Sequence, residues 1–263
     1  MKKTIAFTLL IALAVATFAR QKKNIQLQSI KKEMKSEHIS STITIDFPTG
    51  SNAFLTRNLR EYVNEALGGT YSGNIADSTA LLHFYTKMNF DSLQSIMQSP
   101  ENAEAPTAEG MYSCSITRLE ETEKYVTMQM AWARYTGGAH EFHEFSAATF
   151  RKTDGRKFGY DMFRTIDNDF YNLLKEGLRS YFEDCEQGKR ITDEELKEMI
   201  FPENNINFLP RPVYPPYLTQ KGVAFVYQPY EITPWAAGMP TFIIPYEKIS
   251  HLLTATVKEL IGE

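Results

Sequence analysis

The sequence has very little cysteine and no excess of basic residues, and each shortage excludes a class of protein. Cys114 and Cys185 are the only cysteines among 263 residues, too few for a disulfide scaffold or a four-thiolate zinc site. Lys and Arg number 28 against 32 Asp and Glu, so the formal net charge is -4. Because nucleic-acid binders normally carry a basic face, we expect no nucleic-acid partner.

Long apolar runs are also scarce, and the one that stands out lies at the start of the chain. In residues 1–19, Lys2 and Lys3 precede an apolar stretch that ends in small residues at Thr17 and Ala19. This layout is typical of a secretory signal peptide, and the stretch is short for a membrane span. We predict cleavage after Ala19 and an exported protein, periplasmic or secreted, with no membrane span. An uncleaved anchor is the alternative.

Export would permit a disulfide between the two cysteines, but the local pattern favours a different state for one of them. Tyr112, Cys114 and Ile116 alternate as the residues of a half-buried strand do. Free cysteine is among the most buried residue types. We therefore favour a buried thiol at Cys114 and leave the disulfide open.

What the sequence does contain is a regular series of strand and helix patterns, with 43% hydrophobic and 13% aromatic residues. Period-two alternation predicts strands, and the predicted strands are 43–47, 111–119, 125–135, 141–151, 223–228 and 241–244. Helical spacing predicts helices over 51–67, 78–97, 166–182, from Thr192 to about 201, and 249–260. The expected class is α+β, with an antiparallel meander in the middle of the chain and helices packed on it.

Residues 135–140 form the most unusual local sequence, because two adjacent glycines follow a predicted buried strand. Glycine permits positive φ or close backbone approach, and adjacent amides hold an anion or a carbonyl group. The segment is not a P-loop, since the required Lys and Ser/Thr are missing. The candidate binding residues are Tyr135, Gly137, Gly138 and His140. The alternative is a strained turn between two strands.

Metal and nucleophilic chemistry find no support in the sequence. His140 and His143 are three residues apart, which on a strand points them to opposite faces. The helical metalloprotease spacing is absent, and so is a G-x-S-x-G nucleophile elbow. We predict no catalytic residue, no metal and no cofactor.

A later segment is rich in rigid aromatics and prolines, which suit recognition of a protein or a sugar. Its candidate ligand-binding residues are Tyr230, Glu231, Trp235 and Gly238. The alternative is that the segment only covers the core. If it does bind, we expect the functional surface where this segment approaches residues 135–140.

Taken together, three motifs resemble a known family. They are residues 135–140 (Tyr-Thr-Gly-Gly-Ala-His), the Asp154-Gly155 turn, and the block 230–246 with Tyr-Glu-Ile, Ala-Ala-Gly and Ile-Pro-Tyr. In this order they look like the extracytoplasmic region of RsiV-type proteins, over about residues 26–255. The resemblance implies a PdaC-type module at 26–155 and an RsiV-like module at 156–263, forming one body.

The resemblance implies a sensor or binding domain of the cell envelope, and lysozyme is the ligand of the RsiV-type domain. This sequence has neither a sigma-factor-binding segment before the apolar stretch nor a deacetylase domain. We therefore expect a non-enzymatic envelope binding protein that recognises lysozyme or a peptidoglycan-related ligand, with its oligomeric state open. The alternative is an envelope hydrolase that uses His140 with Glu141 or Glu231.

Overall fold

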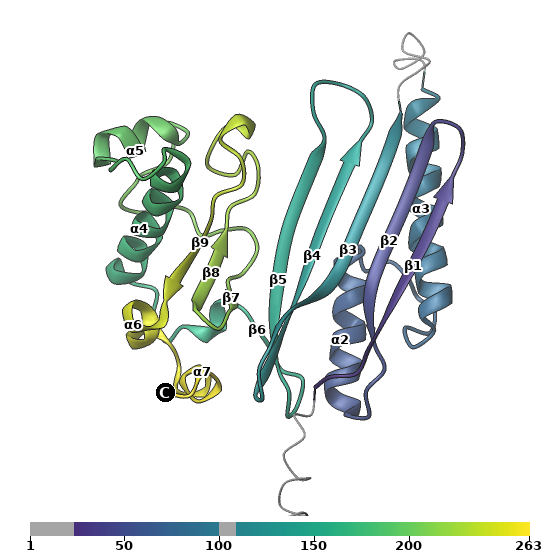
Figure 1. Cartoon of the computed structure of the whole chain (residues 1–263), viewed down its shortest axis with the longest axis horizontal. Coiled ribbons are helices and arrows are strands. Elements are labelled where there is room, and N and C mark those ends of the chain that lie inside the picture. The colour runs from purple at the N-terminus through teal and green to yellow at the C-terminus, as the bar shows by residue number, and fades with distance from the viewer. Residues whose placement is uncertain (1–23, 100–108) are drawn as a thin grey trace, which may run out of the picture.

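A computed structural model describes residues 24–99 and 109–263, so the predicted signal peptide at 1–19 lies outside the described residues. Its larger part is a six-stranded sheet (Figure 1). In spatial order the strands are β1 (Leu27–Lys35), β2 (Ile39–Pro48), β3 (Gly110–Glu121), β4 (Tyr125–Tyr135), β5 (Phe142–Arg151) and β6 (Lys157–Phe158). Neighbours are antiparallel except β2 and β3, which are parallel. The α+β class and the antiparallel meander are confirmed; β1 was not predicted.

Two helices form the crossover that the parallel pair requires. They are α2 (Ala53–Ala66) and α3 (Ser78–Met97), and both cover the same face of the sheet (Figure 1). The helix predicted over 51–67 begins at Ala53, because Asn52 is its N-cap: the Asn52 side chain accepts the hydrogen bond from the Leu55 amide. Helix α2 ends as predicted before Gly68 and Gly69, both at positive φ.

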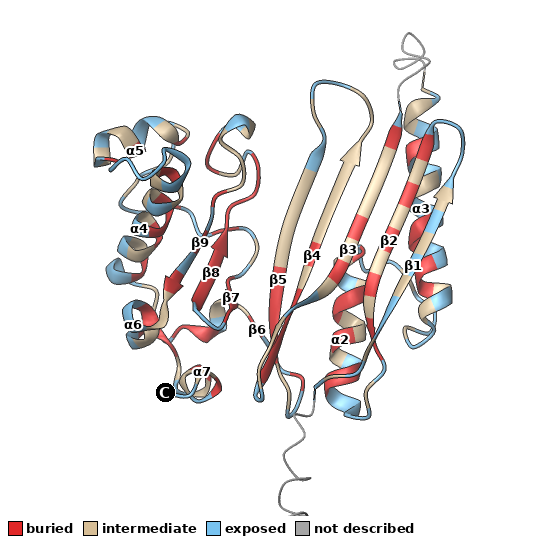
Figure 2. Ribbon diagram, viewed as in Figure 1, coloured by how far each residue is buried: buried red, intermediate tan, exposed pale blue. Residues whose placement is uncertain are grey.

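The first core cluster lies between these helices and the sheet. Its residues are among those coloured as buried on α2, α3 and the facing strands in Figure 2. It includes Ile43, Ile45, Phe47, Leu59, Val63, Leu81, Ile116, Val126, Met128 and Phe150. Phe54, an apolar residue in the first turn of α2, is 71% exposed. With 3.6 residues per turn, position 54 is rotated by about 100° from its buried neighbour Leu55.

A second body is built on a three-stranded antiparallel sheet. Its elements are β7 (Tyr217–Leu218), β8 (Gly222–Val226), β9 (Thr241–Pro245), α4 (Asn168–Cys185), α5 (Asp193–Met199), α6 (Tyr246–Ile249) and α7 (Ala255–Ile261), with short 3-10 turns at Tyr160–Met162, Trp235–Ala237 and Ser250–Leu252. Helix α5 begins with the predicted capping box at Thr192. The core of this second body includes Phe170, Leu174, Phe225 and Phe242.

The single closing helix predicted over 249–260 is wrong. The chain breaks between α6 and α7, because Leu253 is extended and pairs with Phe163 in an isolated β-bridge. The Thr254 amide then donates to the Met162 carbonyl oxygen at 2.9 Å. Tertiary backbone pairing therefore overrides the helical spacing of the apolar residues at this point.

The two sheets are joined by a buried hydrogen-bonded link. On the face of the large sheet opposite its helices, Thr127 Oγ1 and Thr149 Oγ1 lie 2.9 Å apart. Thr127 donates to the Leu218 carbonyl oxygen at 2.8 Å, and the Leu218 amide donates to Thr149 at 2.8 Å. The link lies beside a small apolar cluster that includes Ala147 and Tyr217. Where the two sheets are linked, the layers therefore run from the helices of the larger body through its sheet and the three-stranded sheet to the helices of the smaller body.

The two cysteines lie in different bodies, and both are free. Cys114 is buried on β3, whereas Cys185 is exposed at the end of α4. Burial raises the pKa of the Cys114 thiol to about 12, so this thiol stays protonated. Within the described ranges, no helix is long and apolar enough to cross a membrane.

Candidate binding surface

The glycine loop connects the ends of two long strands. β4 ends at Tyr135 and β5 begins at Phe142, and the chain turns between them with Gly137 and Gly138 at φ 95° and 103°. These angles are open to glycine and rarely adopted by other residues. The Tyr135 hydroxyl donates to the Gly138 carbonyl oxygen at 3.1 Å. The loop is therefore a turn that depends on its two glycines and is fixed by its own tyrosine.

The second segment follows β8 and is held against α4. Tyr230 adopts φ 65° and is 51% exposed. The short 3-10 turn Trp235–Ala237 ends at Gly238, also at positive φ. The Tyr181 hydroxyl of α4 donates to the Ala237 carbonyl oxygen at 2.8 Å. A side chain at position 238 would meet that hydroxyl at 2.8 Å, which explains why glycine occupies it.

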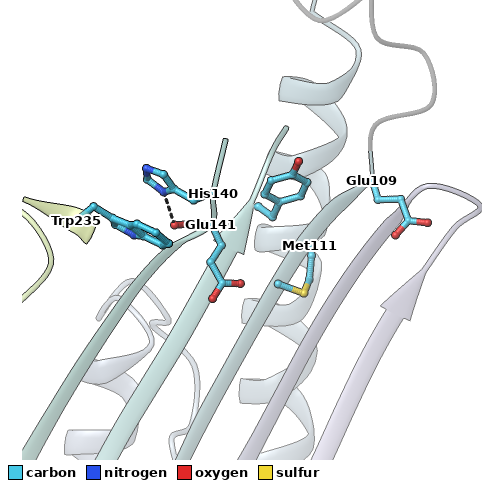
Figure 3. A pocket seen from close by; sticks show the side chains of 6 residues that line it. Glu109, Met111, His140, Glu141 and Trp235 are labelled. Carbon is cyan, nitrogen blue, oxygen red and sulfur yellow. Dashed lines mark hydrogen bonds between the residues drawn. The ribbon is translucent and has the colours of Figure 1, made fainter. Parts of the chain in front are cut away.

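His140 brings the two segments together (Figure 3). Its ring stacks on Trp235 with centroids 4.1 Å apart and planes 15° from parallel. Its Nε2 lies 3.2 Å from the Tyr230 hydroxyl, and its Nδ1 lies 2.9 Å from the backbone carbonyl oxygen of Glu141. Both ring nitrogens are therefore engaged. Segments about a hundred residues apart in sequence meet at one stacked pair of rings.

Beside this pair lies an open pocket of about 470 Å³. It is lined by Glu109, Met111, Tyr135, His140, Glu141 and Trp235 (Figure 3). We call these residues together with Tyr230 the His140 surface. The surface combines aromatic rings with two carboxylates and lies at the ends of β3, β4 and β5. Glu109, Met111 and Glu141 were not among the predicted binding residues, although the predicted antiparallel pairing of 111–119 with 125–135 brings Met111 beside Tyr135, and Glu141 was named only in the hydrolase alternative.

Glu231 does not belong to the His140 surface. Its carboxylate accepts hydrogen bonds from the Val213 amide at 2.6 Å and the Gln228 amide at 2.7 Å. Burial raises the pKa of this carboxyl group, although both amides oppose the shift. Glu231 thus fixes residues 208–217, which carry four prolines and are called the proline-rich segment below, to the loop that follows β8. Of the predicted residues, Tyr135, His140, Tyr230 and Trp235 come together, whereas Glu231 points elsewhere.

The hydrolase alternative pairs His140 with the carboxylate of Glu141 or Glu231, and in the described residues the His140 ring instead contacts the Glu141 backbone oxygen and the Tyr230 hydroxyl. Glu231 is bound to amides as described, and the Glu141 carboxylate lies 3.8 Å from His143 Nδ1. Among residues 24–99 and 109–263, no hydrogen bond or ion pair joins His140 to a carboxylate. In the same part of the chain, no three His, Cys, Asp or Glu side chains gather as a metal ion would need.

One positioning residue gave no signal in the sequence. The Gln228 side chain accepts from the Phe145 amide at 3.0 Å and donates to the Phe145 carbonyl oxygen at 2.9 Å. It thereby pairs with the outer edge of β5 as a short strand would. This amide pair fixes the Trp235 segment relative to the strand that carries the glycine loop.

Comparison with known proteins gives a family relationship for part of the chain. Residues 161–247 match a family model described as "Protein of unknown function (DUF3298)". No curated protein matches. A solved DUF3298 structure from Bacteroides fragilis is 21% identical, with a TM-score of 0.69, and the alignment covers 93% of this chain and 100% of that one. One from Pseudomonas aeruginosa is 15% identical, with a TM-score of 0.63, over 90% and 97%. At these identities the likeness shows the fold alone.

Proposed function

We propose that this chain is an exported, non-enzymatic binding protein of the cell envelope that uses the His140 surface to hold its ligand. The observation that carries the proposal is the stacked pair of His140 and Trp235, with the exposed Tyr230 bonded to it. Trp and Tyr side chains are enriched among the residues that dominate binding energies at protein interfaces. The RsiV-like and PdaC-type modules expected from the sequence motifs point to the same class of function.

The backbone at Tyr230 adds support, because it is held in an unfavourable conformation. A non-glycine residue at positive φ costs about 1–3 kcal/mol and is found preferentially at functional sites. Here the strain presents the tyrosine ring to solvent while its hydroxyl meets His140. A segment that only covered the core would have no need to expose this ring.

The charges at the pocket favour a particular class of ligand. Glu109 and Glu141 line it, and no Lys or Arg is among its lining residues. Opposite charge on a partner steers association and sets specificity. We therefore propose a positively charged protein ligand, with lysozyme as the first candidate; a cell-wall glycan is the competing outcome.

The test uses the mature chain, residues 20–263, immobilised and exposed to lysozyme, with cosedimentation on purified peptidoglycan run in parallel. We expect lysozyme to bind, and Trp235→Ala to weaken binding by about thirtyfold, which corresponds to a hot spot of about 2 kcal/mol. Raising the salt concentration should weaken binding of the unaltered chain, because the carboxylates are exposed. Phe54→Ala, which removes an exposed ring elsewhere, should change nothing.

Two variants keep the proposal falsifiable. If Trp235→Ala lowers the melting temperature as much as the core variant Phe170→Ala, Trp235 is structural and the proposal loses its main residue. Tyr230→Asn removes the exposed ring while asparagine tolerates the left-handed backbone, so it should weaken binding and leave melting unchanged. Failure of both ligands to bind, or full binding by both variants, would overturn the proposal.

A further inference from the structure

A second pocket, of about 510 Å³, lies on the other face of the large sheet at its β5 edge, and it is separate from the His140 surface. Helix α2, strands β4 to β6 and the proline-rich segment enclose it. We call it the Tyr62 pocket; its lining residues include Tyr62, Glu65, Met130, Ser146, Lys157 and Tyr214. It shares no lining residue with the pocket beside His140. Pockets of this size at the junction of two bodies are common ligand sites.

The most informative atom in this pocket is the Tyr62 hydroxyl. Tyr62 is only 8% exposed, yet its hydroxyl has no hydrogen-bond partner of good geometry among the described residues, although Ser146 lies close by. Burial raises the pKa of Tyr62, so the group is a neutral hydroxyl that both donates and accepts. A buried polar group without a partner is costly. A ligand oxygen that entered the pocket would remove that cost.

Two further hydroxyl groups converge on the same space. Ser146 lies on β5, and Tyr214 approaches from the proline-rich segment. The Tyr214 hydroxyl donates to Glu144 Oε2 at 2.6 Å, and the same oxygen accepts from Trp132 Nε1 at 3.1 Å. This arrangement fixes the Tyr214 ring and leaves the lone pairs of its oxygen available as acceptors. The pocket thus offers several uncharged donors and acceptors at fixed positions.

The charged groups around the pocket are paired with one another. Lys157 Nζ lies 2.9 Å from Glu65 Oε2. Asp161 accepts from Arg156 at 2.8 Å and from the Gly159 amide at 2.8 Å. An ionised ligand would need an unpaired charge of opposite sign to replace its lost hydration. Because each charged lining residue already has its partner, the pocket suits an uncharged ligand.

The remaining walls are apolar. Met130, Ala148, Phe158 and Pro215 line the pocket. Outside the pocket but on the same face of the sheet, Trp132 of β4 and Phe142 of β5 have ring centroids 5.5 Å apart, and Phe142 is exposed. Aromatic and aliphatic side chains pack against the C–H faces of a ring compound while hydroxyl groups bond its edge. We propose that the Tyr62 pocket binds an uncharged polyhydroxylated ring, such as one sugar residue.

The experiment titrates the mature chain with rings that differ in charge but hardly in shape, and it follows saturation transfer by NMR. The neutral probes are glucose, galactose, N-acetylglucosamine and inositol; the charged counterparts are glucuronate and glucosamine. We expect at least one neutral probe to bind, and both glucuronate and glucosamine to bind more weakly than that probe. Absence of binding by all four neutral probes at about 10 mM, or preference for a charged probe, would overturn the proposal.

Variants then locate the site. Tyr62→Phe keeps the ring and removes the hydroxyl, so binding of the neutral probe should weaken by about tenfold. Its melting temperature should stay equal or rise, because an unpaired buried group is removed. Tyr217→Phe removes a hydroxyl from another buried tyrosine outside the pocket and should leave binding unchanged. Equal binding by Tyr62→Phe and the unaltered chain would show that the sugar lies elsewhere and would overturn the proposal.

Discussion

The six-stranded body and the three-stranded body differ in what holds their backbone in place. In the larger body, β1 to β5 are 9 to 12 residues long, and their ladders satisfy most backbone groups. In the smaller body, β7 to β9 have only 2 to 5 residues. Most of its connecting chain is irregular, and buried irregular backbone must find other partners.

Tyrosine hydroxyls supply many of those partners. Four of them donate to backbone carbonyl oxygens of irregular segments at 2.6 to 2.8 Å: Tyr160 to Pro212, Tyr227 to Pro210, Tyr181 to Ala237 and Tyr246 to Thr219. Glu231 adds two bonds from amides. The proline-rich segment is therefore ordered without forming a helix or strand.

The comparison also shows where binding residues arise. Both candidate sites take residues from irregular segments of the smaller body whose backbone is held by side-chain hydrogen bonds. These residues are Trp235 and Tyr230 in the His140 surface and Tyr214 in the Tyr62 pocket. In each case they face residues that the long strands hold in register. A rigid sheet supplies half of each candidate site, and adaptable loops supply the other half.

The largest expected effect tests whether the two bodies are one cooperative unit. Phe225 is fully buried in the smaller body and contacts the rings of Phe163, Phe170 and Phe242. Phe225→Ala should lower the free energy of unfolding by about 3–5 kcal/mol. Because the sheets share the Thr127–Leu218 link, we expect a single thermal transition, shifted as a whole, in calorimetry.

A matched variant in the larger body sharpens this test. Leu59→Ala removes a buried side chain between α2 and the sheet and should also shift one transition, by about 2–5 kcal/mol. If either variant instead splits the melting curve into two transitions, with the other body melting at its original temperature, the two bodies are independent.

A smaller effect is expected from the link itself. Thr127→Val keeps the shape of the side chain but removes the donor to the Leu218 carbonyl oxygen, which would then be buried without a partner. We expect a loss of about 1–3 kcal/mol in urea denaturation. Thr86→Val is the control, because Thr86 is equally buried and its hydroxyl has no partner among the described residues. Equal effects from the two variants would mean that the link does not hold the sheets together.

The contrast between the bodies also explains what the sequence could predict. In the larger body, strict alternation and helical spacing follow from burial on one face, so β4 and α3 were located to the residue. In the smaller body, bonds such as Tyr227 to Pro210 leave no periodic pattern. The closing helix was predicted wrongly for the same reason, since the bridge between Phe163 and Leu253 joins distant segments.

The candidate site was accessible to sequence reasoning in part. Two unusual local sequences indicated the site. They are the double glycine in residues 135–140 and the aromatic cluster with a carboxylate in residues 230–238, and these two segments do meet. Which side chains face each other was not accessible. Glu231 and Trp235 are four residues apart, yet one binds backbone amides while the other stacks on His140.

The smallest effect concerns an exposed ion pair in the turn between β5 and β6 of the larger body, where we expect a much smaller loss of stability than from the buried contacts. Hydrogen bonds from the Arg151 guanidinium lower the pKa of Asp154 to about 2. A carboxyl group with a lowered folded-state pKa stabilises the fold above its unfolded pKa, and this stabilisation is lost as the pH falls through about 2. Because the pair is exposed, Asp154→Asn should cost less than about 1 kcal/mol at neutral pH. Urea denaturation at falling pH should show the two stabilities converging toward pH 2. If the difference in unfolding free energy between the two chains stayed constant over this pH range, the effect would come from the shape of the turn and not from the ion pair. A difference above about 2 kcal/mol would mean that this exposed ion pair contributes as much stability as a buried contact.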